Sequence, residues 1–135
     1  MKKQLLLLFG ILLVLACSSV KQTEQALNTG NYDQAINIAL KNLRTNKHKK
    51  GKQSYVLMLE SAYAKATERD LNHINFLMKD GNRANLEEVY NTYKQLNRRQ
   101  ERIKPLLPLT VYETGRKAVF KLNDYSSDII RTKDM

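Results

Sequence analysis

The sequence predicts a mainly α-helical fold of irregular helical hairpins, followed by a short β-like C-terminal tail. Three segments carry apolar residues at the 3.6-residue spacing of an amphipathic helix. Glycine-containing turns separate these segments, and the prolines come only after the last of them. We expect a signal peptide over residues 1–16, a helical domain over residues 17–104, and short strands with a terminal segment over residues 105–135.

Length and composition limit what the chain can hold. Its 135 residues allow one modest domain, and 23 Lys and Arg against 13 Asp and Glu give a net charge of +10. The single cysteine excludes an intrachain disulfide framework and a zinc site built on several thiolates. Two histidines leave little for a histidine-rich metal cluster. We therefore expect neither a metal nor a soluble cofactor.

The N-terminus has the three-part form of a secretory signal. Lys2 and Lys3 form a positive region, residues 5–16 are almost entirely apolar, and Cys17 follows directly. The apolar run is too short for a hydrocarbon core that needs about 20 helical residues to cross. The pattern predicts a signal peptide in place of a permanent transmembrane helix.

The end of this segment reads Val14-Leu15-Ala16-Cys17. It resembles the lipobox of bacterial lipoprotein signals, in which a cysteine thiolate is nucleophilic enough to take a diacylglycerol as a thioether. The resemblance implies cleavage before Cys17, a diacylglycerol on its sulfur and an acyl chain on the freed amine. Ser18 stands where Asp favours retention at the inner membrane, which implies an outer-membrane protein facing the periplasm.

The first amphipathic helix is predicted over residues 33–43. Its apolar positions form one stripe: Ala35, Ile36, Ala39, Leu40 and Leu43. A shorter helix over residues 21–29 would place Ala26 and Leu27 against this stripe after a turn at Gly30-Asn31. Together the two helices predict a helical hairpin.

The second amphipathic segment runs over residues 52–79 and ends at the turn Asp80-Gly81-Asn82. Its stripe consists of Tyr55, Leu59, Ala62, Tyr63, Ala66, Ile74 and Leu77. Asp70 and His73 fall on the same arc if the helix is unbroken. Alternatively, Thr67 and Asp70 mark a new helix start and turn Asp70 outward. We favour one long helix.

The third helix is predicted to start at an Asn85 cap, with Glu88 as its capping-box partner, and to stop at Pro105. Its stripe is Leu86, Val89, Tyr90, Tyr93, Leu96 and Ile103. The last turns carry a basic cluster that we attribute to the negative end of the helix dipole: Arg98, Arg99, Arg102 and Lys104.

The tail has the alternating, β-branched and aromatic character of two short strands around Gly115, over residues 110–112 and 117–122. Ala118, Phe120 and Leu122 would share a face. Ser126, with Asp128 in the first turn, starts a further helix that is too short to be stable alone. We expect the C-terminus either to dock on the bundle or to be a truncated form of a longer parent.

The first turn continues as Gly30-Asn31-Tyr32-Asp33-Gln34-Ala35-Ile36. It resembles the middle of a tetratricopeptide repeat, where a glycine turn, an aromatic residue and a small alanine allow two helices to pack closely. The next Gly-Asn pair, at 81–82, comes too late for that family's period of about 34 residues. The resemblance implies tetratricopeptide-like hairpins of irregular length.

The constellation with the most reactive appearance is Asp70 with His73, three residues apart on one helical face. No second histidine stands at metal-binding spacing, and no nucleophile motif accompanies the pair. A structural pair is the favoured interpretation. We expect no catalytic residue and no metal site, and hence no enzyme.

The strongest basic feature is the turn before the second amphipathic segment, with Lys47, Lys49, Lys50 and Lys52. It is either a solvated turn or a contact for anionic lipid phosphates beside the anchor. Nucleic acid is not expected as a partner of an exported protein. Four tyrosines on the helical stripes are predicted core residues, with a ligand-stacking groove as the alternative: Tyr55, Tyr63, Tyr90 and Tyr93.

Together these features predict a lipid-anchored cell-envelope protein that acts as a non-catalytic protein-interaction module. The membrane is its partner through the anchor, and a hairpin groove would engage another envelope protein. The alternative is a binder of anionic lipid or envelope glycan polymer through the basic turn. A third hypothesis, an accessory hydrolase, would have to depend on Asp70.

Overall fold

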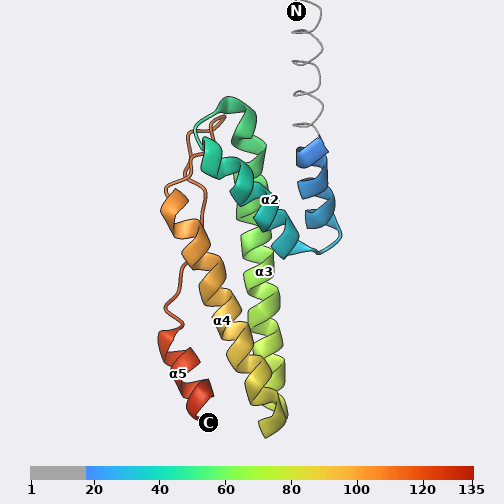
Figure 1. Cartoon of the computed structure of the whole chain (residues 1–135), viewed down its shortest axis with the longest axis vertical. Helices are drawn as coiled ribbons and strands as arrows, with labels where there is room; N and C mark the ends of the chain where they lie inside the picture. Colours follow the sequence, from blue (N-terminus) through green and yellow to red (C-terminus); the bar gives the residue numbers. More distant parts are fainter. Residues whose placement is uncertain (1–17) are drawn as a thin grey trace, which may run out of the picture.

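The computed structural model describes residues 18–135, so the predicted signal peptide and Cys17 lie outside the described residues. An N-terminal helix over residues 18–28 precedes the labelled helices α2 (Tyr32–Thr45), α3 (Gln53–Asp80), α4 (Leu86–Ile103) and α5 (Ser126–Asp134) (Figure 1). Short 3₁₀ turns join them at Lys50–Lys52, Arg83–Asn85 and Lys104–Leu106. The predicted mainly α fold is confirmed.

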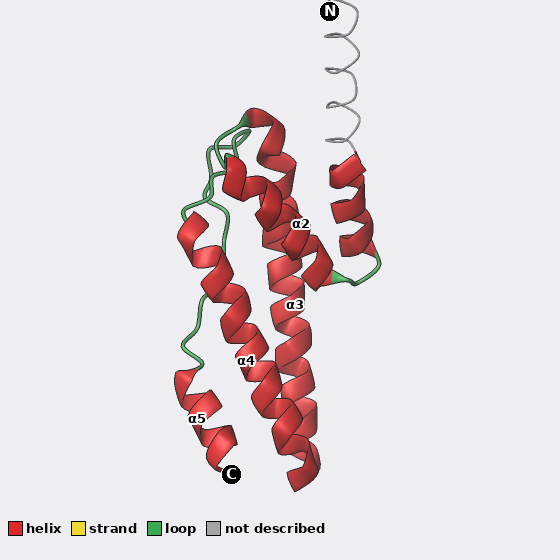
Figure 2. Ribbon diagram, viewed as in Figure 1, coloured by secondary structure: helices red, strands yellow, loops and turns green. Residues whose placement is uncertain are grey.

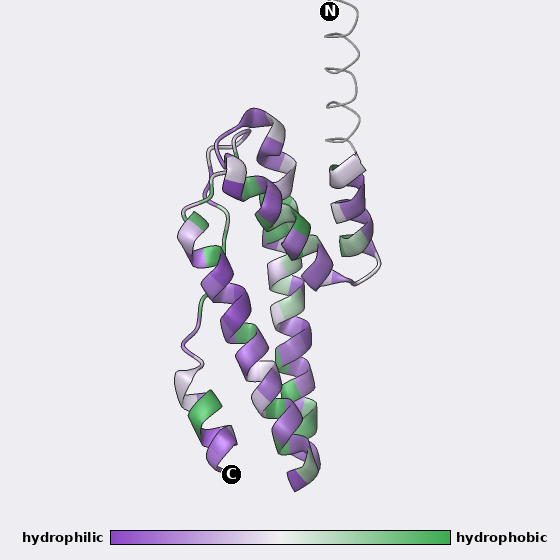
Figure 3. Cartoon of the chain, viewed as in Figure 1, coloured by the Kyte–Doolittle hydropathy of each residue, from purple (hydrophilic) through white to green (hydrophobic). Residues whose placement is uncertain are grey.

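The N-terminal helix and α2 form the expected hairpin. Gly30 adopts a φ of 79°, and the amide of Asn31 bonds back to the carbonyl of Ala26 at 2.8 Å. A residue with a Cβ would be strained at that φ, which explains glycine in the turn. The five predicted stripe residues of α2 are all buried, and Figure 3 shows hydrophobic residues where α2 crosses α3.

Helix α3 runs without a break from Gln53 to Asp80. The alternative of a new helix start at Thr67 is therefore wrong, and Asp70 faces inward. All seven apolar stripe residues of α3 are buried. One half of α3 packs against α2 and the tail, and the other half packs against α4, so α3 connects both parts of the core. Gly81 ends it with a φ of 66°.

The predicted capping box of α4 is wrong. Asn85 lies within a 3₁₀ turn with helical backbone angles, so its side chain points back to α3. There its amide donates to the carbonyl of Leu77 at 3.3 Å and to the carboxylate of Asp80 at 3.0 Å. Asn82 caps the 3₁₀ turn by accepting from the amide of Ala84 at 3.0 Å.

The two predicted strands of the tail do not form. Among residues 18–135 the structure has no strand, and the tail has one isolated antiparallel bridge between Thr110 and Lys117 (Figure 2). Beyond this bridge the tail backbone bonds to helix side chains in place of a second strand. Of the predicted shared face, Ala118 and Phe120 are half-buried, whereas Leu122 is exposed.

Side chains of α3 and α4 hold the tail. Glu60 accepts two bonds from Arg116, both at 2.8 Å, and one from the amide of Val119 at 2.7 Å. The hydrogen bond from Arg116 is the main reason that the pKa of Glu60 is lowered. Gln100 both donates to and accepts from the backbone of Asn123, at 2.6 and 3.1 Å. The tail is thus an integral part of the fold.

The C-terminal helix α5 packs on α4, as the docking alternative predicts. Tyr125 is buried just before α5, and its ring centre lies 6.0 Å from that of Tyr93 on α4. Within residues 18–135, every helix is too short or too polar to cross a membrane.

Leu109→Ala should lower the free energy of unfolding by about 2 to 5 kcal/mol, because Leu109 is a fully buried residue of the core. Val119→Ala is the matched control in the same tail, and its exposed side chain should cost less than about 0.5 kcal/mol. Urea denaturation followed by circular dichroism measures both. Equal effects of the two substitutions would show that the tail is not part of the core.

Candidate functional site

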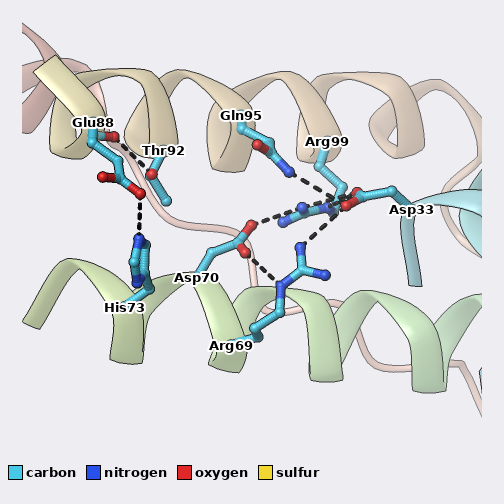
Figure 4. Close-up of polar contacts among 8 residues, drawn as sticks. All are labelled: Asp33, Arg69, Asp70, His73, Glu88, Thr92, Gln95 and Arg99. Atoms are coloured by element: carbon cyan, nitrogen blue, oxygen red, sulfur yellow. Dashed lines mark hydrogen bonds and ion pairs between the residues drawn. The ribbon is translucent and has the colours of Figure 1, made fainter. Parts of the chain in front are cut away.

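One cluster of charged side chains joins three helices, and we call Asp33, Arg69, Asp70 and Arg99 the ionic cluster (Figure 4). Arg99 of α4 donates to Asp33 of α2 at 2.9 and 3.1 Å and to Asp70 of α3 at 2.8 Å. Arg69 completes the cluster by donating to Asp33 at 3.1 Å and to Asp70 at 2.8 Å. Two guanidinium groups therefore balance two carboxylates.

The centre of the cluster is buried. The side chains of Arg99 and Asp70 are 3% and 8% exposed, and one nitrogen of Arg99, Nη1, has no hydrogen-bond partner among the described residues. Removing one member of a buried pair leaves an uncompensated charge, which is much more costly than losing a surface pair. The geometry points to a structural role for Arg99.

Asp33 lies at the solvent edge of the cluster and also accepts a bond from Gln95 at 3.3 Å. Burial raises the pKa of Asp33, but the charges and hydrogen bonds of Arg99 and Arg69 outweigh burial. The pKa of Asp33 is therefore below its ordinary value, which means that folding favours its ionised form.

The sequence did not identify this cluster. The helix dipole does not explain Arg99, which is buried between Leu96 and Ile103 beside the apolar stripe of α4. Arg99 comes three residues after Leu96 and four before Ile103, so it shares their helical face. A cation at such a core position indicates that an anionic partner is buried with it. Asp33 carried no comparable signal.

The predicted pair of Asp70 and His73 is wrong. The two arginines occupy the carboxylate of Asp70, and His73 contacts Glu88 of α4 at 2.7 Å (Figure 4). The reason is that α4 presents a buried cation opposite Asp70 and an exposed carboxylate opposite His73. No group of three or more potential metal ligands occurs among residues 18–135.

The lysines of the basic turn have two different roles. Lys47 donates to the carbonyls of Leu106 and Pro108 at 2.7 and 3.3 Å. Lys52 donates to Asn42 at 2.9 Å and lies 5.5 Å from the ring centre of Tyr55. Lys49 and Lys50 are exposed, and neither side chain makes a hydrogen bond or ion pair within the described part of the chain.

The basic turn and the first described residues of the N-terminal helix lie at the same end of the molecule (Figure 1). The hydroxyls of Ser19 and Tyr55 bond to each other, and Asn42 donates to Ser19 at 3.4 Å. Thr23 donates to the carbonyl of Ser19 at 2.8 Å. Residue 19 is therefore fixed against the body only two residues after Cys17.

A groove of about 440 Å³ lies between α3 and the tail, and we call it the α3–tail groove. Its lining is Tyr63, Ala64, Thr67, Glu68, Leu71, Asn72, Asn75, Val119 and Lys121. Two large apolar side chains, Val119 in its wall and Phe76 one turn beyond Asn72, are each 69% exposed. The lining therefore combines apolar side chains, such as Leu71 and Val119, with polar ones, such as Glu68 and Asn72.

The stripe tyrosines follow the prediction in part. Tyr55 and Tyr63 are buried core residues, and the hydroxyl of Tyr63 reaches the edge to donate to the carbonyl of Lys121 at 2.8 Å. Tyr90 and Tyr93 are only half-buried. Tyr63 thus forms one wall of the α3–tail groove.

No family model matches the chain, and neither the curated proteins nor the solved structures compared with it gave a match.

Arg99→Met should lower the free energy of unfolding by about 3 to 5 kcal/mol, because it leaves Asp70 buried beside a single exposed arginine. Arg98→Met, next to it on the exposed face of α4, should cost less than about 0.5 kcal/mol. Chemical denaturation of both variants tests this. A loss for Arg99→Met no greater than for Arg98→Met would contradict the structural role of Arg99.

The lowered pKa of Asp33 predicts an acid-sensitive contribution to stability. This contribution is complete above the unfolded Asp pKa of about 3.9 and is lost as the pH falls through the lower folded pKa. Asp33→Asn should therefore show a flatter decline of unfolding free energy on acidification than the exposed control Asp134→Asn. Identical slopes for both variants would contradict the assignment.

Proposed function

We propose that the protein is a lipid-anchored cell-envelope protein on the outer membrane, facing the periplasm, which acts as a non-catalytic protein-interaction module. Anchoring is supported by the resemblance of residues 14–17 to a lipobox. It is also supported by Ser19, which bonds to Tyr55 and Asn42 and so holds the described body against a residue only two positions after Cys17.

The single observation that carries the interaction role is the α3–tail groove. Protein interfaces typically combine apolar or aromatic side chains with polar ones, and the lining of the groove contains both kinds. Phe76 and Val119 leave most of their surface in water, which costs free energy unless a partner covers them. The partner that we propose is another envelope protein.

The position of the groove suits this role. Helix α3 has 28 residues, which corresponds to about 40 Å at 1.5 Å per residue. Its N-terminal end adjoins the basic turn on the anchor side, and the groove begins at Tyr63, further along the helix. An anchored body would present the groove away from the bilayer, where a periplasmic surface can reach it.

The proposal of a non-catalytic role has support in the charged residues. Arginine nitrogens occupy both oxygens of Asp70, so this carboxylate is not available as a general base. His73 is paired with Glu88 on an exposed surface. These contacts favour binding over turnover.

A photocrosslinking residue, p-benzoylphenylalanine, placed at Phe76 should capture one discrete protein partner in intact envelopes. The same residue at Asn28, an exposed position of the N-terminal helix, is the control and should give no such band. Gel analysis with mass spectrometry identifies the product. A second arm, Val119→Asp, should reduce capture from position 76 without loss of stability, because Val119 is exposed.

Absence of a discrete product at position 76, or the same product at positions 76 and 28, would contradict the proposed groove interaction.

A further inference from the structure

We propose that Lys49, Lys50 and Tyr112 form a second membrane contact, which binds anionic phospholipid headgroups and fixes the orientation of the anchored body. We call these three residues the membrane contact. The inference rests on the proposed anchor at Cys17 and adds the surface of the fold that faces the bilayer.

A series of side-chain contacts places the basic turn close in space to the residues that follow the proposed anchor. Ser19 contacts Asn42 and Tyr55, and Asn42 in turn accepts a bond from Lys52 at 2.9 Å. These contacts form a continuous series from Ser19 through Asn42 to Lys52. The basic turn therefore lies close in space to a residue only two positions from Cys17. A lipid on Cys17 would therefore hold the turn near the headgroups.

The four lysines of the basic turn differ in whether their ammonium groups already have partners within the fold. Lys47 donates to the carbonyl of Leu106 and Lys52 donates to the side-chain oxygen of Asn42. These bonds fix the basic turn against the rest of the fold. The amide of Lys52 bonds to the carbonyl of Lys49 at 2.9 Å, which forms a 3₁₀ turn. Lys49 and Lys50 remain exposed on this fixed turn. Their ammonium groups are thus available to an external anion.

Tyr112 of the tail lies beside the basic turn, because both bond to the side chain of Gln53. Gln53 at the start of α3 accepts from the amide of Tyr112 at 3.1 Å. The same side chain donates to the carbonyls of Lys47 and Lys49 at 3.5 and 3.4 Å. Gln53 therefore joins the loop of Tyr112 to the basic turn.

The exposure of Tyr112 fits the membrane interface. Tyr112 is 62% exposed, which leaves much of a large amphipathic side chain in contact with water. Tyrosine is enriched at the headgroup level of bilayers, where the ring contacts apolar groups and the hydroxyl stays wet. An exposed tyrosine beside two exposed lysines matches an anionic bilayer surface better than a soluble glycan polymer.

The charges around the membrane contact leave it positive. Glu113 is the acidic neighbour of Tyr112, and Glu60 is paired with Arg116 at 2.8 Å. Arg44 in the last turn of α2 adds another cation at this end of that helix. Attraction between lysines and anionic lipid falls off within a Debye length of about 8 Å at physiological salt. The anchor is what brings the lysines within that range.

The experiment uses the full acylated protein, reconstituted into phosphatidylcholine vesicles with or without phosphatidylglycerol. Because the only natural cysteine carries the proposed anchor, Thr114→Cys introduces a single thiol near the membrane contact for a fluorescent label. Ala84→Cys introduces one at the opposite end, by the α3–α4 turn. Lipids with a spin-labelled headgroup quench a label that lies at the bilayer surface.

We expect strong quenching at position 114 in vesicles with phosphatidylglycerol and little quenching at position 84. Lys49→Glu combined with Lys50→Glu should reduce the quenching at position 114 severalfold, and high salt should do the same. Tyr112→Ser should weaken the quenching further. The control variant, Lys65→Glu with Lys79→Glu, has the same change of net charge on exposed positions of α3 and should leave the quenching unchanged.

Flotation with the vesicles reports the anchor separately. If the protein does not float in either vesicle type, both the proposed anchor and the membrane contact are overturned. If all variants float but quenching at position 114 is equal in neutral and anionic vesicles, only the membrane contact is overturned. The same conclusion follows if the variant at positions 49 and 50 is quenched as strongly as the control variant.

Discussion

The arrangement of the helices depends on the ion pairs that the guanidinium group of Arg99 makes with two carboxylates. This group binds Asp33 of α2 and Asp70 of α3 at once, so one side chain of α4 fixes three helices relative to one another. Apolar contacts between helices allow small changes of register, whereas a buried arginine between two carboxylates has few acceptable positions. Arg69 supplies the second cation that keeps this buried centre neutral.

Further contacts join the start of the described chain and the α3–tail groove to this set of helices. Ser19 is fixed to α2 and α3, and the α3–tail groove lies further along α3. Because the tail is also held to α3 by Glu60 and to α4 by Gln100, the groove belongs to the same body as Ser19, two residues after the proposed anchor. A lipid on Cys17 and a partner in the groove would therefore be held at a defined separation.

Local patterns predicted the helices well and the polar contacts poorly. The stripes of α2 and α3 follow from apolar periodicity, and the turn at Gly81 follows from its required left-handed backbone. The prediction of two strands in the tail is wrong because alternating side chains indicate only an extended backbone. They do not show whether that backbone pairs with another strand or, as here, with the side chains of Gln53 and Glu60. The partners of Arg99 are distant in sequence, so no local spacing reveals them.

Mass spectrometry of the N-terminal peptide of the protein isolated from its native envelope tests the central claim most directly. The account predicts a chain that begins at Cys17, with a thioether-linked diacylglycerol on its sulfur and an acyl chain on its amine. A free Cys17 thiol, or a chain that still begins at Met1, would contradict the lipid anchor and with it the proposed membrane orientation.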